Sequence, residues 1–451
     1  MNILVLNGSP KGKNSVTLQT IHYLELLFPE HRFDILHVGQ KIKALEKDFS
    51  PALTAIEQAD VLLFSYPVYT FLAPCQLHRF IELLKASGAN LSGKYASQLT
   101  TSKHFYDTTA HRYIQDNCDD LGLRYITGLS ADMDDLTKKK GQKEAESFFR
   151  YLCWSVEQKI WEPVKNIPYQ PVHQSVAPAE DQGDKPGDVV IVADLQEHDT
   201  QLKAMVDRFQ GQFPRKTRII NIREYPFRGG CLGCFNCAIT GKCVYTDGFD
   251  DYLRNEIQTA EAIVYAFSIS DHSMGARFKM YDDRQFCNGH RTVTIGMPIG
   301  YLVSGDLSRE ENLRTVIEAR AQVGSNFLAG IATDELDPNA AIDQLCAKLD
   351  YALQEKYLPP QNFYGIGGMK IFRDLIWLMQ GMMRADHKFY KAHKQYDFPQ
   401  KQRGKMMAMY LVGALLSNKK LKAKMGSAMT DGMLMPYNKV LDRVKKEQGK
   451  N

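Results

Sequence analysis

The stretch Asn2-Ile3-Leu4-Val5-Leu6-Asn7-Gly8-Ser9-Pro10 begins the chain with a continuous apolar run that ends in a turn sequence. A short run that is apolar at every position is typical of a strand buried on both faces of a sheet. A helical pattern follows at 16–28. The chain therefore opens with a strand–turn–helix unit of the α/β class.

The same alternation continues through the first 160 or so residues. Strand patterns occur at 2–7, 34–38, 60–65, 95–100 and 124–128, and helical patterns at 16–28, 52–58, 76–86, 109–121 and 143–159. Five strands that are each followed by a helix predict a parallel sheet covered on both faces. We therefore expect a doubly wound α/β domain at residues 1–162.

A second round of the alternation follows a proline-rich linker at 163–187. Strand patterns recur at 188–193, 217–222, 262–268, 292–297 and 330–333, with helical patterns at 200–209, 252–259, 276–286, 313–327 and 340–356. The order and spacing match the first half, which predicts an internal duplication with a second doubly wound domain at 188–358. Two unrelated domains of the same architecture are the alternative.

The last part of the chain, 359–451, differs from both halves in composition. From 356 to 451 there are 19 Lys and Arg against 6 Asp and Glu, and 11 of the 17 Met lie there. Several short helices with a basic, Met-rich surface are expected. Three roles stay open: a cover packed on the two domains, a docking surface for an acidic redox partner, and peripheral contact with anionic lipid.

Composition excludes several classes of protein. The longest apolar run, 406–416, is shorter than the ~18–20 residues of a membrane span. The opening residues have no basic segment of the secretory type, so we expect a cytoplasmic protein. Nine Cys, an odd number, argue against a disulfide framework in such a chain. No nucleic-acid-binding module is visible, and no nucleic acid partner is expected.

The turn after the first strand, 7–17, is the first candidate site. A turn rich in Gly and Ser that leads into a helix presents free backbone N–H groups and the positive end of the helix dipole, which suits a phosphate. The spacing is neither that of a Walker A loop nor that of a G-x-G-x-x-G fingerprint. The candidate phosphate-binding residues are Ser9, Lys11, Asn14, Ser15, Val16 and Thr17.

Two more loops end neighbouring strands at the same sheet edge. The segment 65–74 has two prolines and three aromatic residues, which can form a rigid apolar wall beside a flat ring, although an ordinary packed loop is the alternative. The segment 100–104 adds a polar patch. The candidate ring-binding residues are Pro67, Val68, Tyr69, Thr70, Thr101 and Ser102.

Together the three loops resemble the FMN-binding loops of the flavodoxin-like NAD(P)H-dependent FMN reductase family. The resemblance covers about the first 160 residues. It implies FMN with its phosphate at the first loop and its isoalloxazine at the second, completed by the third. It also implies a flavin-dependent NAD(P)H oxidoreductase, but it names no substrate and does not separate NADH from NADPH.

Cys231, Cys234, Cys237 and Cys243 form a C-x2-C-x2-C-x5-C segment in the second half. Three cysteines at intervals of three can surround one side of a compact centre that the fourth closes, which suits a [4Fe–4S] cluster. Zinc, which more often has two separated C-x2-C pairs, and thiols without a metal remain alternatives. With the residues up to Asp251, the segment resembles the cysteine motif of the iron–sulfur flavoproteins, which share the flavodoxin-like fold.

The second half departs from the flavin-binding pattern. In 191–200, Gly and Ser are absent, and Asp194, Glu197 and Asp199 put negative charge where a phosphate would lie. The segment 268–275 lacks the prolines and aromatic residues of its counterpart. We therefore predict FMN in the first half and the cluster in the second, with the duplication taking the place of a dimer.

The expected function is electron transfer from NAD(P)H or a reduced carrier, through FMN and the cluster, to a small redox acceptor or a carrier protein such as a ferredoxin. A cluster-free NAD(P)H:quinone or FMN reductase and a non-catalytic FMN- or metal-binding scaffold are the alternatives. His104, His272 and His290 are candidates for proton relay, but solvated or hydrogen-bonded histidines are the preferred interpretation, so no catalytic residue is assigned. The oligomeric state stays open, a homodimer included.

Overall fold

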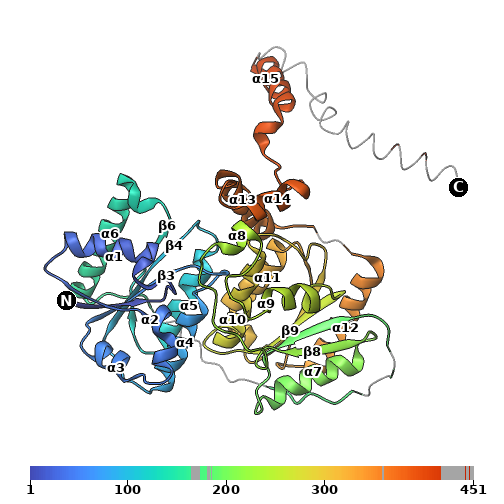
Figure 1. Cartoon of the computed structure of the whole chain (residues 1–451), viewed down its shortest axis with the longest axis horizontal. Helices are drawn as coiled ribbons and strands as arrows, with labels where there is room; N and C mark the ends of the chain where they lie inside the picture. The colour runs from blue at the N-terminus through green and yellow to red at the C-terminus, as the bar shows by residue number, and fades with distance from the viewer. Residues whose placement is uncertain are drawn as a thin grey trace. The chain divides into compact units, whose positions relative to one another are not determined.

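The strand β1 (Asn2–Asn7) lies at the centre of the first of two parallel sheets. The computed structural model describes residues 1–163, 173–179, 183, 185–357, 360–417, 442 and 446. By their internal contacts, the residues form one unit at Met1–Tyr390 and a second at Lys391–Asn451. Both sheets belong to the first unit (Figure 1).

The first sheet has the strand order β2-β1-β3-β4-β5, with β6 also paired to β4 and every pair parallel. This is the order of flavodoxin-like sheets, in which ligands bind beyond the carboxyl ends of the strands. The strands are β2 (Arg32–Leu36), β3 (Val61–Pro67), β4 (Tyr95–Ser102), β5 (Arg124–Tyr125) and β6 (Leu129–Asp132); the helices are α1 (Val16–Leu27), α2 (Val38–Leu45), α3 (Ser50–Glu57), α4 (Cys75–Ala86), α5 (Asp107–Asp120) and α6 (Lys139–Gln158).

The second sheet repeats this order as β8-β7-β9-β10-β11, again wholly parallel. The prediction of two tandem flavodoxin-like domains is confirmed. The strands are β7 (Val189–Ala193), β8 (Thr217–Asn221), β9 (Ala262–Ser268), β10 (Pro298–Ser304) and β11 (Phe327–Thr333); the helices are α7 (Thr200–Gln212), α8 (Asn236–Thr240), α9 (Phe249–Tyr252), α10 (Gly275–Arg284), α11 (Glu311–Val323) and α12 (Pro338–Glu355).

Helices α4 and α10 join the two halves by packing against each other, and one hydrophobic core runs through both. Glu82 of α4 accepts a hydrogen bond from the backbone N–H of Ala276 at the start of α10 (2.7 Å). Asp283 of α10 accepts one from the N–H of Cys75 at the start of α4 (2.9 Å). Each helix therefore satisfies a free N-terminal amide of the other, and the two carboxylates occupy equivalent positions in the two halves.

The turns that precede these helices are also alike. Tyr69 pairs with Leu72, and Ser270 pairs with Ser273, through the same antiparallel bridge. The two residues inside each turn, 70 and 71 or 271 and 272, have positive φ although none is glycine. A shared backbone irregularity at equivalent positions is what an internal duplication predicts.

Two details of the secondary structure differ from the sequence prediction. The fourth strand of the second half was expected at 292–297, but β10 begins at Pro298 and contains Gly300. Both residue types usually mark strand ends; here Pro298 is the first strand residue, where its missing N–H costs no ladder bond. The second strand was expected at 34–38, whereas β2 ends at Leu36 and Val38 begins the unpredicted helix α2.

The first helix of the carboxyl-terminal part covers the two domains. Helix α13 (Phe363–Leu378) packs on α11. A Cβ atom on Gly365 would lie 2.7 Å from the carbonyl oxygen of Gln322, so glycine allows the close approach. Tyr106 of the first half donates a hydrogen bond to the carbonyl of Tyr364 (2.7 Å). Up to Tyr390, the interpretation as a cover agrees with these contacts.

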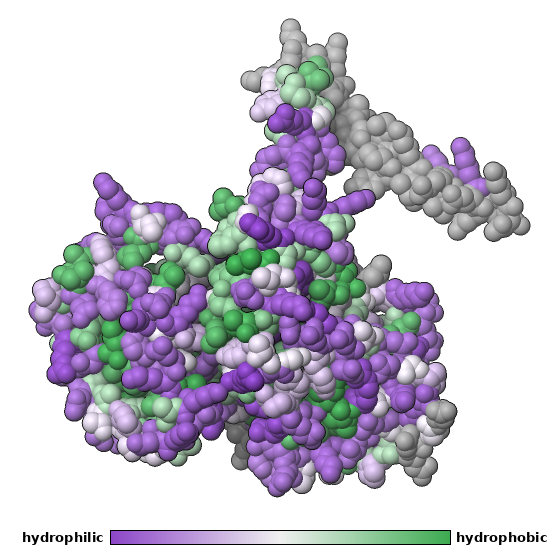
Figure 2. All heavy atoms as spheres, viewed as in Figure 1, coloured by the Kyte–Doolittle hydropathy of each residue, from purple (hydrophilic) through white to green (hydrophobic). Residues whose placement is uncertain are grey.

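Two more helices follow, α14 (Arg384–Ala392) and α15 (Arg403–Ser417). On α15 the side chains of Met407, Tyr410 and Leu411 are exposed. Figure 2 shows green, hydrophobic surface at this helix. None of the helices in the described part of the chain is long and apolar enough to span a membrane. The expected helices beyond 417 lie outside the described residues, as does much of the linker 163–187. The domain boundaries 1–162, 188–358 and 359–451 stay a prediction.

A histidine joins the two halves at the edge of their interface. Asp120 and Glu310 lie 3.0 and 2.9 Å from the two ring nitrogens of His272. Burial alone would lower the pKa of His272, but these carboxylates raise it to about 10. Burial would raise the pKa of Asp120, but hydrogen bonds from His272 and Lys85 lower it to about 2. His272 thus holds the halves together and is no relay near the candidate flavin loops.

We expect His272→Gln to reduce the free energy of unfolding by about 2 kcal/mol near pH 6. The stabilisation is complete below the ordinary histidine pKa of about 6.5 and is lost as the pH rises through about 10. In acid, the stabilisation by this ion pair is lost as the pH falls from about 4 towards about 2, because Asp120 is then protonated. Urea denaturation from pH 4 to 10 measures the difference, with exposed His198→Gln as control; equal losses at pH 6 and 10 would contradict it.

Candidate functional site

One cavity in the first unit brings the predicted sites of both halves together. Eleven of the twelve predicted flavin-binding residues line it, and so do all four cysteines of the motif. Asn14 is the exception: it ends a short 3-10 turn and is exposed. The cavity residues from the prediction are Ser9, Lys11, Ser15, Val16, Thr17, Pro67, Val68, Tyr69, Thr70, Thr101, Ser102, Cys231, Cys234, Cys237 and Cys243.

The first loop is shaped by the buried Asn7 at the end of β1. Its side-chain amide donates to the carbonyl of Gly12 (2.9 Å), and its side-chain oxygen accepts from the N–H of Ser9 (3.1 Å). Gly12 has φ +56°, which lets the chain turn back towards the helix. These contacts hold the loop between β1 and α1 in a compact turn.

The start of α1 is free to bind an anion. Ser15, the N-cap residue, forms no side-chain cap, and its hydroxyl has no hydrogen-bond partner among the described residues. The first N–H groups of the helix have no partner within the helix. Thr17 contacts Thr101 through their hydroxyl oxygens (2.6 Å), which joins the first loop to the third. An uncapped helix end lined by buried hydroxyls fits a phosphate group.

Charged residues from the second half hold the second loop in its strained shape. Lys279, which is wholly buried, donates to the carbonyl of Tyr69 (3.0 Å), and Thr70 donates to Asp283. Lys279 and Asp283 also form a buried ion pair. Because Thr70 and Phe71 both have positive φ, the loop costs conformational energy that these contacts offset. The ring-facing wall therefore depends on α10.

The cysteine segment lies against this wall. A Cβ atom on Gly233 would lie 1.9 Å from the hydroxyl oxygen of Tyr69, so the backbone there passes directly over the tyrosine. Gly233 also donates its N–H to the sulfur of Cys231 (3.4 Å). Burial raises the pKa of the Cys231 thiol, and it raises the pKa of Cys237 to about 11. All nine cysteines are free thiols.

Four thiols around one cavity, with an N–H group already on a sulfur, supply the donors that a [4Fe–4S] cluster uses. Their arrangement is not that of a preformed metal site. Within the described ranges, no group of three or more His, Cys, Asp or Glu side chains is placed to hold a metal ion. The donor set fits the cluster in chemistry, and the cluster stays a proposal.

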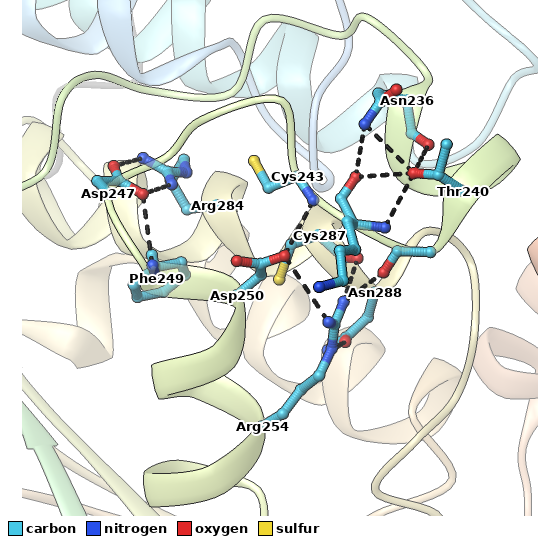
Figure 3. Close-up of polar contacts among 12 residues, drawn as sticks. Asn236, Thr240, Cys243, Asp247, Phe249, Asp250, Arg254, Arg284, Cys287 and Asn288 are labelled. Atoms are coloured by element: carbon cyan, nitrogen blue, oxygen red, sulfur yellow. Dashed lines mark hydrogen bonds and ion pairs between the residues drawn. The ribbon is translucent and has the colours of Figure 1, made fainter.

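Two arginines fix the path of the cysteine segment (Figure 3). Arg284, at the end of α10, forms two hydrogen bonds with Asp247 (2.7 and 2.8 Å) and donates to the carbonyl of Gly229 (2.9 Å). Both side chains are almost fully buried. Arg254 donates to the carbonyls of Gly241 (2.7 Å) and Cys287 (2.9 Å). The arginines thereby hold both ends of the segment and its last turn.

Several residues of the cavity were missed in the sequence. Cys287, which lies outside the predicted motif, lines the cavity beside the four predicted cysteines. His290 lines it too, whereas His104 is an exposed partner of Asp107. Helix α13 adds Phe372. No local sequence signal marks these residues, because only the packing of the second domain and of α13 brings them to the cavity.

The loop after β7 in the second half differs in chemistry from the phosphate-binding loop predicted after β1. Asp194, at the end of β7, is buried and paired with Arg223 (2.6 Å). Burial raises the pKa of Asp194, against the effect of Arg223. A polar cavity of about 1010 Å³ beside it contains Asp199 and Arg277 as well. That this half binds no FMN in the usual way stays a prediction.

A family model described as NADPH-dependent FMN reductase matches residues 1–114. The match covers the first 114 of 451 residues and shows a similarity to this family. The matched segment extends from β1 into α5 and includes all three predicted flavin loops, but not the cysteine segment.

Solved structures of similar proteins cover about a third of the chain. They include an NADH:FMN oxidoreductase (EMOB) in its apo form (20% identity, 34% of this chain and 89% of that chain, TM-score 0.30). An FMN-dependent NADH-azoreductase from Bacillus anthracis is 14% identical (33% and 98%, TM-score 0.27). An NAD(P)H:quinone oxidoreductase from Methanothermobacter marburgensis is 12% identical (37% and 99%, TM-score 0.28). None of the curated proteins matches the sequence.

We expect Arg284→Met to lower the free energy of unfolding by about 3–5 kcal/mol, because it leaves Asp247 buried without its partner. The cysteine segment should also react faster with a thiol reagent. Urea denaturation and the rate of thiol modification measure the two effects. Arg228→Met is the matched control: Arg228 is exposed, and among the described residues its side chain bonds only Thr246 (2.8 Å), so its loss should stay within about 0.5 kcal/mol. Equal stability of the two variants would contradict the role of Arg284.

Proposed function

We propose that the chain moves electrons between NAD(P)H or a reduced carrier and an acceptor by means of one FMN and one [4Fe–4S] cluster, each bound by a different half. One observation supports the proposal: residues of all three predicted flavin loops of the first domain and the four cysteines of the second domain line the same cavity. Two redox groups in one cavity would lie close enough to exchange electrons.

The residues of the first half suit FMN. The phosphate would accept hydrogen bonds from the first N–H groups of α1 and from the free hydroxyl of Ser15, while Lys11 offsets its charge. Ser9, Asn14, Val16 and Thr17 complete this end. The ring would lie along Pro67, Val68, Tyr69 and Thr70, with Thr101 and Ser102 at its polar edge. FMN, when bound, supplies the hydride and electron chemistry, and the protein supplies its position.

The cysteines of the second half suit the cluster. Cys231, Cys234, Cys237 and Cys243 would bind its irons, and the N–H of Gly233 would stabilise the charge on one sulfur. The cluster, when bound, carries single electrons, which suits a carrier protein such as a ferredoxin as partner. We place this protein in the cytoplasm, with the domains at 1–162 and 188–358 joined by the linker and followed by the extension 359–451.

A cluster-free NAD(P)H:quinone reductase is the second candidate. The observation that favours it is the aromatic wall of the cavity, formed by Phe235, Phe286 and Phe372. A flat apolar acceptor would pack well there. The two candidates differ in their iron content, and a non-catalytic scaffold would differ from both in that NAD(P)H would not bleach its flavin.

Protein prepared without oxygen should be yellow and contain one FMN, with about four iron and four sulfide per chain. Cys234→Ser should lose the iron and keep the FMN. Cys153→Ser, which changes a cysteine remote from the motif, should keep both. The visible spectrum and metal analysis measure this. Native protein with FMN and no iron after reconstitution would favour the cluster-free reductase; colourless protein that takes up no added FMN would refute both candidates.

We expect Ser15→Asp to weaken FMN binding by about 100-fold or more. A carboxylate at the start of α1 would repel the phosphate and occupy the free N–H groups, at a cost of a few kcal/mol. Flavin fluorescence titration measures the affinity. Ser50→Asp makes the same change at the start of α3, where Ser50 is exposed, and should leave binding as it is. Similar affinities of the two variants would place the phosphate elsewhere.

A further inference from the structure

We propose that His290, positioned by Asp386 from the carboxyl-terminal extension, is the proton donor of the cavity and serves an acceptor that takes up protons together with electrons. The inference rests on the proposed function and deepens it by naming the class of acceptor: a carbonyl compound whose reduction forms O–H bonds, in contrast to a carrier that takes electrons alone.

Asp386 on α14 holds His290 at two points. One oxygen of its carboxylate lies 3.0 Å from Nδ1 of the imidazole and accepts a hydrogen bond from the N–H of the same residue (3.2 Å). One turn later on α14, the hydroxyl of Tyr390 donates to the carbonyl of His290 (3.2 Å). Asp386 and Tyr390 are both fully buried. Position 290 is therefore bound at its backbone and its side chain by one helix.

Gly289, next to His290, leaves room for the carboxylate of Asp386. Gly289 has φ +61°, and a Cβ atom there would lie 2.3 Å from an oxygen of Asp386. The carboxylate thus packs directly on the glycine, where a side chain would displace it. Arg291 contributes positive charge 3.8 Å from the same carboxylate.

The imidazole is held at a fixed angle and open on one side. It packs edge-to-face between Phe286 and Phe372, with ring centroids 5.9 and 4.9 Å away. Its Nε2 has no hydrogen-bond partner among the described residues, and the residue lines the cavity. No hydrogen bond or ion pair within the described ranges joins it to the motif cysteines. A carboxylate on Nδ1 therefore leaves Nε2 for exchange with a molecule in the cavity.

The surroundings make a protein proton donor necessary. The cavity wall around His290 is apolar, with Phe235, Phe286, Ile371, Phe372 and Leu375. Water is a poor proton source in such a space. Of the other cationic side chains that line the cavity, Lys103 is paired with Asp132 (2.7 Å) and Arg284 with Asp247, whereas Lys11 belongs to the first flavin loop. An imidazole can both accept and donate a proton, and Asp386 fixes its orientation through Nδ1.

The proposed reaction reduces a C=O group by two electrons and two protons. A C=O group of the acceptor gains two electrons and one proton, as a hydride equivalent, from the NAD(P)H-reduced coenzyme. The oxygen that carries the negative charge after this step gains a proton from Nε2 of the doubly protonated imidazole of His290, which keeps its proton on Nδ1, so that the product has two hydrogens more than the acceptor. His290 then recovers a proton from water when the product leaves. Asp386 exchanges no proton with the acceptor and acts as a positioning residue.

The test compares two acceptors. 1,4-Benzoquinone takes up protons with its electrons, whereas ferricyanide takes up electrons alone. We expect His290→Gln to lower the turnover of NAD(P)H with benzoquinone by about 100-fold and to leave turnover with ferricyanide and the FMN content unchanged. Asp386→Asn should show the same selectivity with a smaller loss. His22→Gln, which changes an exposed histidine beside Glu25, is the control.

A readout independent of turnover is the ¹⁵N spectrum of the histidines in coenzyme-free protein. Nδ1 of His290 should be protonated in both the neutral and the charged form of the ring, and Asp386→Asn should change this signal, whether or not His290→Gln folds. Equal losses with both acceptors, no loss with benzoquinone, or a proton on Nε2 alone would overturn the proposal. Native protein that binds no FMN or reduces neither acceptor would instead refute the proposed function.

Discussion

The packing of α4 against α10 is the contact on which the rest of the structure depends. Two helix N-termini are buried at this interface, and each is satisfied by a carboxylate of the other helix, Glu82 or Asp283. A buried amide without a partner would cost about 1–3 kcal/mol. Because each half provides the acceptor for an amide at the helix start of the other, these bonds favour one mutual arrangement of the halves. That arrangement brings the loop after β3 to the cysteine segment.

The two halves have the same fold, but they contribute different loops to the cavity. Both halves have the same strand order and the same strained turn before the central helix. After β1 the chain has an uncapped helix end with free hydroxyls, whereas after β7 Asp194 is paired with Arg223. The cysteine segment has no counterpart in the first half. The duplication therefore supplies a scaffold, and divergence of the loops makes one composite cavity from two.

The carboxyl-terminal extension contributes to the same cavity. Helix α13 adds Phe372 to its wall, and α14 adds the carboxylate that holds His290. Neither helix is part of the flavodoxin-like fold, and the family match ends before them. The extension therefore covers the two domains and also provides apolar surroundings for His290 and the carboxylate that orients it.

Sequence alone determined what is local in the chain. Each strand and helix pattern, each of the three loops and the cysteine spacing lie in one contiguous segment, where periodicity and turn chemistry act over a few residues. The sequence did not predict β10 at its observed place, because Pro298 and Gly300 are residue types that usually mark the ends of strands. The buried position of this segment nevertheless favours a strand. Only the tertiary structure decided that the cysteines face the flavin loops and that Asp386 meets His290. Such contacts depend on the packing of whole helices, which no short stretch of sequence encodes.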